Sequence, residues 1–456
     1  MLDHKLRRVL GLPAVTFIAI GTTIGGGVFI FTGIVFKITG TGLPLAYLLA
    51  VIPVFISMLP LAMLGSAIPT VGGNYRYPSR MVSPGLAFVG IWVYALAAFF
   101  GQIPLYALGC ARYAQLLFPS LSPEGFAIGL VTFFFVINLT GVKPAAQIQG
   151  VLVLILIAAL FYYAVSGFTA ISSIDFTNIL DKGWGNLFIG TALLTFTYFG
   201  SNAIIEMGGE IVNPGKTIPR AFAIAFPVVA VIYIAVAIAT VANLPAGEVK
   251  QVDEPLIATS RIILSKGGTV FFIIGGAILA LITTLNAMFL VGTRSILIII
   301  EDELLPKRFG LIHSRFKTPW NLLLFIWIFS VAGIVSGLSL HTLASYAALG
   351  GLIIFFPTML AALRFPSLYP EQYRNADFKL KGFWLWACPV VGILMVLFFG
   401  LVIVIDLKTP VNIGCFLFFI ASGAFFYQWR KRNLKKRGID LVKKVVEKEQ
   451  WGSKTQ

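Results

Sequence analysis

The stretch AIGTTIGGGVFIF, residues Ala19–Phe31, lies inside a long apolar run and yet contains four glycines and two threonines. Glycine is a poor helix former, and the consecutive residues Gly25, Gly26 and Gly27 favour a break in a helix. An open backbone exposes N–H and C=O groups that must find partners inside a bilayer. The stretch therefore predicts a membrane helix whose interruption offers polar backbone groups to a ligand.

The composition of the whole chain supports the membrane interpretation. The 456 residues are 58% hydrophobic and only 11% charged, with a mean hydropathy of +0.93. Repeated apolar runs of about 20 residues predict membrane-spanning helices. Since hydrophilic stretches are short, we expect a single transmembrane domain over residues 1–429 and a basic cytoplasmic tail over residues 430–456.

Hydropathy predicts twelve spans, at residues 12–36, 43–68, 84–109, 124–140, 146–168, 187–208, 218–243, 269–300, 320–337, 341–363, 384–405 and 411–429. An even number of spans places both termini on one side, and most of the 34 lysine and arginine residues fall on that side. Basic loops favour the cytoplasm, so we expect a multi-pass protein of the cell membrane with both termini cytoplasmic. The net charge of +16 then reflects the orientation of the protein in the membrane and its contact with anionic lipid, rather than nucleic-acid binding. The basic tail is expected to fix this topology by touching anionic lipid.

A second interruption is predicted in the sixth span, where TFTYFGSNAIIEMGGE places Gly200, Ser201 and Asn202 near the centre. The two interruptions lie five spans apart, which indicates inverted repeats over about 12–168 and 187–363, followed by two further helices over about 384–429. Half-helix N-termini suit a carboxylate, and free carbonyls suit an ammonium group or a cation. The alternative is that the glycines only allow close helix packing.

Several motifs, taken in order along the chain, resemble those of the amino acid/polyamine/organocation (APC) transporter superfamily. They are IGGGVF in the first span, GGNYRY (Gly72–Tyr77), GVKPAAQIQ (Gly141–Gln149), EIVNPGKTIPRA (Glu210–Ala221) and the segment beginning TTLNAMFLVGTRS in the eighth span. The resemblance implies an all-α membrane fold with ten core helices in two inverted five-helix repeats plus two more. It also implies secondary transport of amino acids or amines by alternating access.

By the same resemblance, the substrate carboxylate binds at the first interruption and its ammonium group binds carbonyls at both. The corresponding substrate-binding residues are Thr23, Gly25, Gly26, Gly27, Phe196, Phe199, Gly200 and Asn202. Phe196 and Tyr198 could instead be core residues. Because Asn202 is neutral and Glu206 is the sole acid nearby, we expect neutral amino acids rather than amines or cationic amino acids, which remain the alternative substrates.

The coupling ion is predicted from what the fifth and eighth spans contain. Many APC transporters carry a lysine where this chain has Leu156. By resemblance, a sodium site would comprise Gly21, Ile24, Ala280, Thr283 and Thr284. The alternative is that both hydroxyls bond back to the preceding turn. Sodium coupling and uncoupled exchange or facilitation are equally favoured, ahead of proton coupling through Glu206, for which a structural hydrogen bond is slightly favoured. Arg294 is expected to be structural or part of an inner gate.

Other classes of protein fit the sequence less well. An enzyme would need a second cluster of polar residues within the spans, and the sequence contains none. Three scattered cysteines and three scattered histidines predict neither a metal site nor a cofactor. An amino acid sensor that binds without transport would use the same pocket and is kept as an alternative. We expect a small-molecule substrate, the bilayer and no obligatory protein partner.

Overall fold

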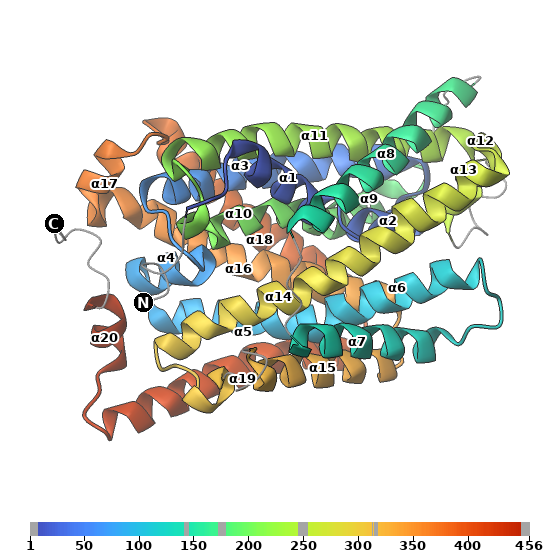
Figure 1. The fold of residues 1–456 in the computed structure, drawn as a ribbon. Coiled ribbons are helices and arrows are strands. Elements are labelled where there is room, and N and C mark those ends of the chain that lie inside the picture. The colour runs from blue at the N-terminus through green and yellow to red at the C-terminus, as the bar shows by residue number, and fades with distance from the viewer. Residues whose placement is uncertain are drawn as a thin grey trace.

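The structure is a computed structural model that describes residues 8–140, 146–171, 179–244, 254–311, 313 and 318–447. The start of the predicted motif Gly141–Gln149 and the end of the tail lie outside these residues. The described chain is almost entirely helical (Figure 1). Nine segments among the described residues are long and apolar enough to cross a membrane, and the first of these contains two spans.

Helices occupy all twelve predicted spans. The first repeat contains α1 (Leu12–Thr23) with α2 (Gly27–Thr39), α3 (Leu43–Ala67), α5 (Pro84–Leu96) with η2 (Ala97–Gln102) and α6 (Ile103–Gln115), α7 (Pro123–Thr140) and α8 (Ala146–Ala170). The second contains α9 (Gly183–Thr195) with η3 (Phe196–Asn202) and α10 (Ala203–Glu206), α11 (Pro214–Asn243), α13 (Lys266–Phe271) with η5 (Phe272–Ile278) and α14 (Leu279–Glu301), α15 (Trp320–Val335) and α16 (Leu340–Leu368). The last two spans are α18 (Phe383–Asp406) and α19 (Pro410–Lys435), and short helices form α4 (Gly73–Met81), α12 (Pro255–Ile263), α17 (Pro370–Asn375) and α20 (Leu441–Glu447).

The first predicted interruption is confirmed, because the first span divides into α1 and α2 around Ile24–Gly26. The second differs in form, since the sixth span tightens into the 3₁₀-helical segment η3 instead of opening. Hydroxyl groups explain this difference. Thr195 and Thr197 each donate to the carbonyl three residues earlier, at 2.6 and 2.7 Å. Such bonds compete with the α-helical ladder.

Two π-helical segments show the same five-span spacing as the interruptions. One is η2 in the third span and the other is η5 in the eighth. Single π-turns are rare inside α-helices and often lie at functional sites. Their matched positions support the predicted repeat, which remains a prediction from position.

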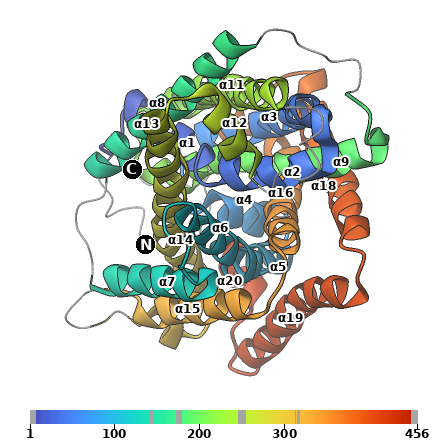
Figure 2. The same ribbon diagram turned by 90° about the vertical axis from the view of Figure 1, so that its right-hand side faces the viewer.

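Both described chain ends lie at one end of the helix bundle, which we call the terminal end. There Leu10 pairs with Ile211, Val71 pairs with Met207, and α20 packs against α4 (Figure 1). Viewed from the other end, α1, α2 and α14 lie inside the bundle and α19 lies at its edge (Figure 2).

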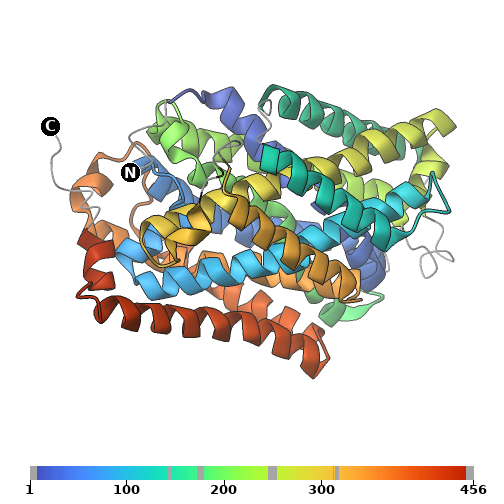
Figure 3. The same cartoon turned by 60° about the horizontal axis from the view of Figure 1, so that its bottom comes forward.

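The C-terminal segment that the sequence predicts to contact lipid is partly helical. The helix of the last predicted span, α19, continues beyond residue 429 to Lys435 along the outside of the bundle (Figure 3). Lysine and arginine are good helix formers, so a charged sequence can prolong the helix beyond its apolar part. The chain then turns back into α20, whose Leu441 and Val445 are buried against the protein.

Candidate functional site

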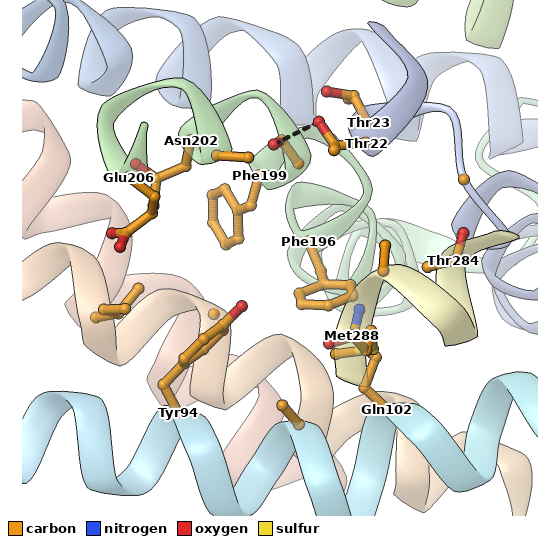
Figure 4. A pocket seen from close by; sticks show the side chains of 18 of the residues that line it. Thr22, Thr23, Tyr94, Gln102, Phe196, Phe199, Asn202, Glu206, Thr284 and Met288 are labelled. Carbon is orange, nitrogen blue, oxygen red and sulfur yellow. Dashed lines mark hydrogen bonds between the residues drawn. The ribbon is translucent and has the colours of Figure 1, made fainter. Parts of the chain in front are cut away.

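A cavity of about 170 Å³ lies where the two interrupted helices meet in the middle of the bundle. Its walls come from α1, α2, α4, α5, η2, α6, η3, α10, α14 and α16 (Figure 4). The lining runs from Tyr106 on α6 to Asn74 and Glu206 near the terminal end. The interruptions and the cavity therefore coincide, as the sequence predicts for a ligand site.

Most of the predicted substrate-binding residues line this cavity. They are Thr23, Gly25, Gly27, Phe196, Phe199, Gly200 and Asn202. Gly26 is not among the lining residues, and its N–H donates to Thr284 Oγ1 at 2.9 Å. The backbone amide at the centre of the glycine triplet is thus joined to α14 in this structure.

Gly200 allows α1 and η3 to touch backbone to backbone. A Cβ atom on Gly200 would lie 2.5 Å from the Cα of Thr23 and still closer to the carbonyl group of Thr22. The Thr22 hydroxyl also lies 2.9 Å from the Gly200 carbonyl oxygen. No residue with a side chain fits at this contact without moving one helix, so glycine is required by the close approach.

The start of α2 forms the polar wall suited to an anion. Its N-cap, Gly26, has no side chain to cap the helix, and Gly27, the first residue of this 13-residue helix, lines the cavity. The Tyr106 hydroxyl lies close by, 3.5 Å from where a Cβ on Gly27 would be, and accepts a hydrogen bond from Gln102 Nε2 at 3.2 Å. Sequence reasoning missed Tyr106 and Gln102, because nothing local indicates which face of the third span meets the interruption.

One of the carbonyl groups predicted to hold an ammonium group, that of Thr23, already has a hydrogen-bond partner. The Thr23 carbonyl accepts a hydrogen bond from the Tyr233 hydroxyl at 2.6 Å. A carbonyl oxygen has two lone pairs, so one acceptor position remains. Phe196 stacks on Phe31 with ring centroids 5.3 Å apart, and Phe199 packs on Phe355 at 4.5 Å.

Tyr198, by contrast, is a core residue. Its side chain is fully buried and packs on Tyr47, Phe226 and Tyr233. The alternation between core and cavity along η3 follows from its three-residue turn, which brings Phe196 and Phe199 onto one face.

The predicted sodium set is only partly assembled around the cavity. Gly21, Thr283 and Thr284 line it, whereas Ile24 and Ala280 do not. The Thr283 hydroxyl lies 2.9 Å from the Leu279 carbonyl oxygen and 3.0 Å from that of Ala280. The Thr284 hydroxyl donates to the Ala280 carbonyl at 2.7 Å and accepts from Gly26.

The Thr283 and Thr284 hydroxyls donate to carbonyls of the preceding turn and still keep lone pairs on their oxygens. One lone pair of the Thr284 oxygen already accepts from the Gly26 N–H. Leu156, at the position of the lysine found in many APC transporters, is 2% exposed. The side chain of Arg294 lies outside the described part of the structure.

Glu206 has a structural partner that the sequence did not reveal. Its Oε1 atom accepts hydrogen bonds from the Asn74 backbone N–H at 3.1 Å and from Asn74 Nδ2 at 2.7 Å. Gly72, with φ of +71°, turns the chain into α4, and its N–H donates to the Glu206 carbonyl at 3.2 Å. The GGNYRY motif thus places Asn74 beside the cavity.

Two ion pairs, one of them buried, lie at the terminal end of the bundle. Arg80 on α4 forms a bidentate pair with Asp302 after α14, with N–O distances of 2.6 and 3.1 Å, and each side chain is 2% exposed. Lys444 on α20 pairs with Glu303 at 3.0 Å. These contacts join α4, α14 and α20 at the end of the bundle that the cavity approaches.

A bundle of membrane spans around a central cavity at two interrupted helices is the arrangement of a multi-pass membrane transporter, not of an enzyme. The amino acid permease family model matches residues 14–435, so the chain belongs to the amino acid permease family, within the APC superfamily. Its function class is amino acid transport.

Curated relatives match at low identity over most of their length. The chain is 24% identical to the branched-chain amino acid permease BcaP of Bacillus subtilis over 92% of this chain and 94% of that protein. It is 26% identical to the methylthioribose transporter of the same organism, over 93% of this chain and 94% of that protein. It is 29% identical to its serine/threonine exchanger SteT, over 70% and 74%.

Proposed function

We propose that this protein carries neutral amino acids across the cell membrane by alternating access. The observation that carries the proposal is the cavity lining, in which, among the described residues, Glu206 is the one aspartate, glutamate, lysine, arginine or histidine. An amino acid zwitterion needs one anion site and one cation site, and a neutral side chain needs no further charge. A cationic side chain would depend on Glu206, whose Oε1 is already held by Asn74.

The two ends of the zwitterion fit the two walls. The carboxylate binds the N–H groups at the start of α2, where the helix dipole is positive, and accepts from the Tyr106 hydroxyl. The ammonium group donates to the carbonyls of Thr23, Phe196 and Phe199. Phe196 and Phe199 cover the bound molecule with their rings.

Release would occur towards the terminal end, which the basic loops assign to the cytoplasm. Opening there requires α4, α10 and α14 to separate, and the Arg80–Asp302 pair is the buried contact that resists this motion. The relatives support amino acid transport as the class, since BcaP is named for branched-chain amino acids, SteT for serine and threonine, and a further relative for cationic amino acids.

The test is uptake into proteoliposomes that contain the purified full chain. Radiolabelled alanine, leucine and threonine are compared with arginine and putrescine, and empty liposomes are the control. We expect uptake of at least one neutral amino acid to exceed that of arginine about tenfold. Preference for arginine or putrescine would refute neutral specificity, and saturable binding without uptake would favour the sensor alternative.

For coupling, we propose uncoupled exchange ahead of sodium or proton coupling. The support is that Leu156 supplies no titratable group and that Thr284 already accepts from Gly26. Sodium and proton gradients are imposed separately on liposomes preloaded with amino acid. We expect uptake to depend on internal amino acid and not on either gradient. Sodium-driven accumulation that is lost in Thr283→Val would instead establish the sodium site.

A further inference from the structure

The short helix α20 lies across the terminal end of the bundle (Figure 1). It packs against α4, and its residues Leu441 and Val445 are 1% and 0% exposed. It also reaches the segment that follows α14, because Lys444 Nζ lies 3.0 Å from Glu303 Oε1. This helix therefore contacts α4 by apolar packing and the end of α14 by an ion pair.

Two adjacent acids after α14 connect it to α4 and to α20. Asp302 forms the buried bidentate pair with Arg80 of α4. Glu303, the next residue, forms the partly exposed pair with Lys444 of α20. Because α20 is attached to both α4 and the end of α14, these two helices cannot move apart unless α20 leaves one of them.

The helix α4 also reaches the cavity. Asn74, its second residue, donates to Glu206 Oε1 from its backbone N–H at 3.1 Å and from its side chain at 2.7 Å. One helix thus meets the cavity wall at its start and carries α20 on its surface. Release of α20 would free the helix whose movement opens the cavity at this end.

The segment that leads into α20 presents positive charge at the edge of the bundle. The exposed basic residues that follow the apolar part of α19 are Lys431, Arg432, Lys435, Lys436 and Arg437. Because α19 lies at the edge of the bundle, these side chains leave the membrane next to lipid headgroups (Figure 2). Basic clusters directly after a membrane helix attract anionic lipid, and a helix with apolar residues and lysines can lie on such a surface.

We propose that α20 is a latch that holds the terminal end closed, and that a bilayer surface carrying anionic phospholipid releases it. The inference rests on the proposed opening of the terminal end and adds a control of its rate. Lipid phosphates replace the Glu303 carboxylate at Lys444, and the apolar residues of α20 move from α4 to the bilayer surface. A surface without net charge attracts the basic segment less, so α20 stays on α4.

The experiment measures initial uptake of the best transported amino acid by the full chain in two kinds of liposome. One contains phosphatidylcholine alone, and the other contains about one third phosphatidylglycerol. Lys444→Glu places two carboxylates together, and a partly exposed ion pair shifts an equilibrium about two- to fivefold, so we expect uptake in phosphatidylcholine to rise by that factor. Phosphatidylglycerol should raise wild-type uptake by a similar factor and leave the variant nearly unchanged.

Two results in these liposomes would overturn the proposal. Equal uptake by wild type and Lys444→Glu in phosphatidylcholine would show that the pair does not hold the end closed. Equal stimulation of both proteins by phosphatidylglycerol would show that anionic lipid does not act through α20.

Matched variants separate the latch from a general effect of surface charge. Glu303→Lys combined with Lys444→Glu restores the pair with its charges exchanged and should return uptake to the wild-type value. Lys381→Glu makes the same charge change at an exposed position between α17 and α18 and should leave uptake unchanged. A rise in Lys381→Glu equal to that in Lys444→Glu would contradict the latch.

A reversible crosslink tests the latch independently of the ion pair. Glu303→Cys and Lys444→Cys are joined by a bifunctional methanethiosulfonate reagent, with the exposed Cys415 changed to alanine and the two buried cysteines kept. We expect uptake by the crosslinked protein to fall at least about tenfold and to return after reduction. Crosslinked protein that transports normally would refute the latch and leave the proposed function standing, whereas no uptake in either lipid would refute the proposed function itself.

Discussion

Replacing Gly200 with alanine tests whether the contact between the two interrupted helices is required for transport. The added Cβ would lie 2.5 Å from the Cα of Thr23. Carbon atoms pack at about 3.5 Å or more, so the backbones of α1 and η3 must separate by roughly 1 Å. The atoms that must move are backbone atoms, which cannot turn aside as a flexible side chain can.

The expected magnitude follows from two costs. Overpacking a well-packed contact costs about 1–3 kcal/mol, and we expect the upper half of that range because backbone is displaced. Separation also lengthens the 2.9 Å contact between the Thr22 hydroxyl and the Gly200 carbonyl, a bond worth about 0.5–1.5 kcal/mol. Since about 1.4 kcal/mol corresponds to a factor of ten, the combined cost of about 2.5–4.5 kcal/mol should lower kcat/KM for uptake by about 60- to 1,600-fold.

The assay is uptake of the best neutral substrate in proteoliposomes, with the amount of inserted protein measured in the same preparation. Gly400→Ala on α18 is the control, because a Cβ there meets no atom within 4 Å. It should leave uptake unchanged, and alanine should favour the helix slightly. Wild-type uptake by correctly inserted Gly200→Ala would refute the close-contact reasoning.

Three further changes test other contacts of the structure. Thr284→Val removes the acceptor of the Gly26 N–H and should lower kcat/KM about tenfold, since an unpaired buried donor costs about 1–3 kcal/mol. Thr284→Ser keeps the hydroxyl and should restore uptake. Equal loss of uptake in both variants would contradict this role. Arg80→Ala leaves the Asp302 carboxylate buried without its bidentate partner and should destabilise the protein by about 3–5 kcal/mol. Thermal unfolding in detergent measures this loss. An unchanged midpoint of thermal unfolding would show that the pair does not stabilise the protein. Glu206→Gln keeps an acceptor for Asn74 and should leave the pH dependence of uptake unchanged, whereas loss of a wild-type pH response would establish proton coupling.

Local chemistry explains why much of the fold was predictable from the sequence. A membrane helix is determined by about 20 consecutive apolar residues, and a break by glycines within them, so both are visible without knowledge of neighbours. The spans and the division at Ile24–Gly26 were confirmed on this basis. The helical form of η3 was not predicted, because it depends on which carbonyls the hydroxyls of Thr195 and Thr197 bond.

The content of the site depended on contacts between distant parts of the chain. Asn74 meets Glu206 across 132 residues, and Gly26 meets Thr284 across 258. Tyr106 faces Gly27 only because the third span packs against the first interruption. No local pattern encodes such pairs, since many hydroxyls and amides in the sequence could serve equally well.

The sequence by itself determined the membrane helices and the interruption of the first one, because hydropathy and glycine spacing act over short distances, and its motifs indicated the transporter family. Only the tertiary structure decided which polar groups are already paired and which are left for a ligand. Gly26 is paired with α14, whereas Asn202 Oδ1 has no hydrogen-bond donor among the described residues. The physical reason is that a hydrogen bond needs a partner within about 3 Å, and packing of the whole bundle sets that distance.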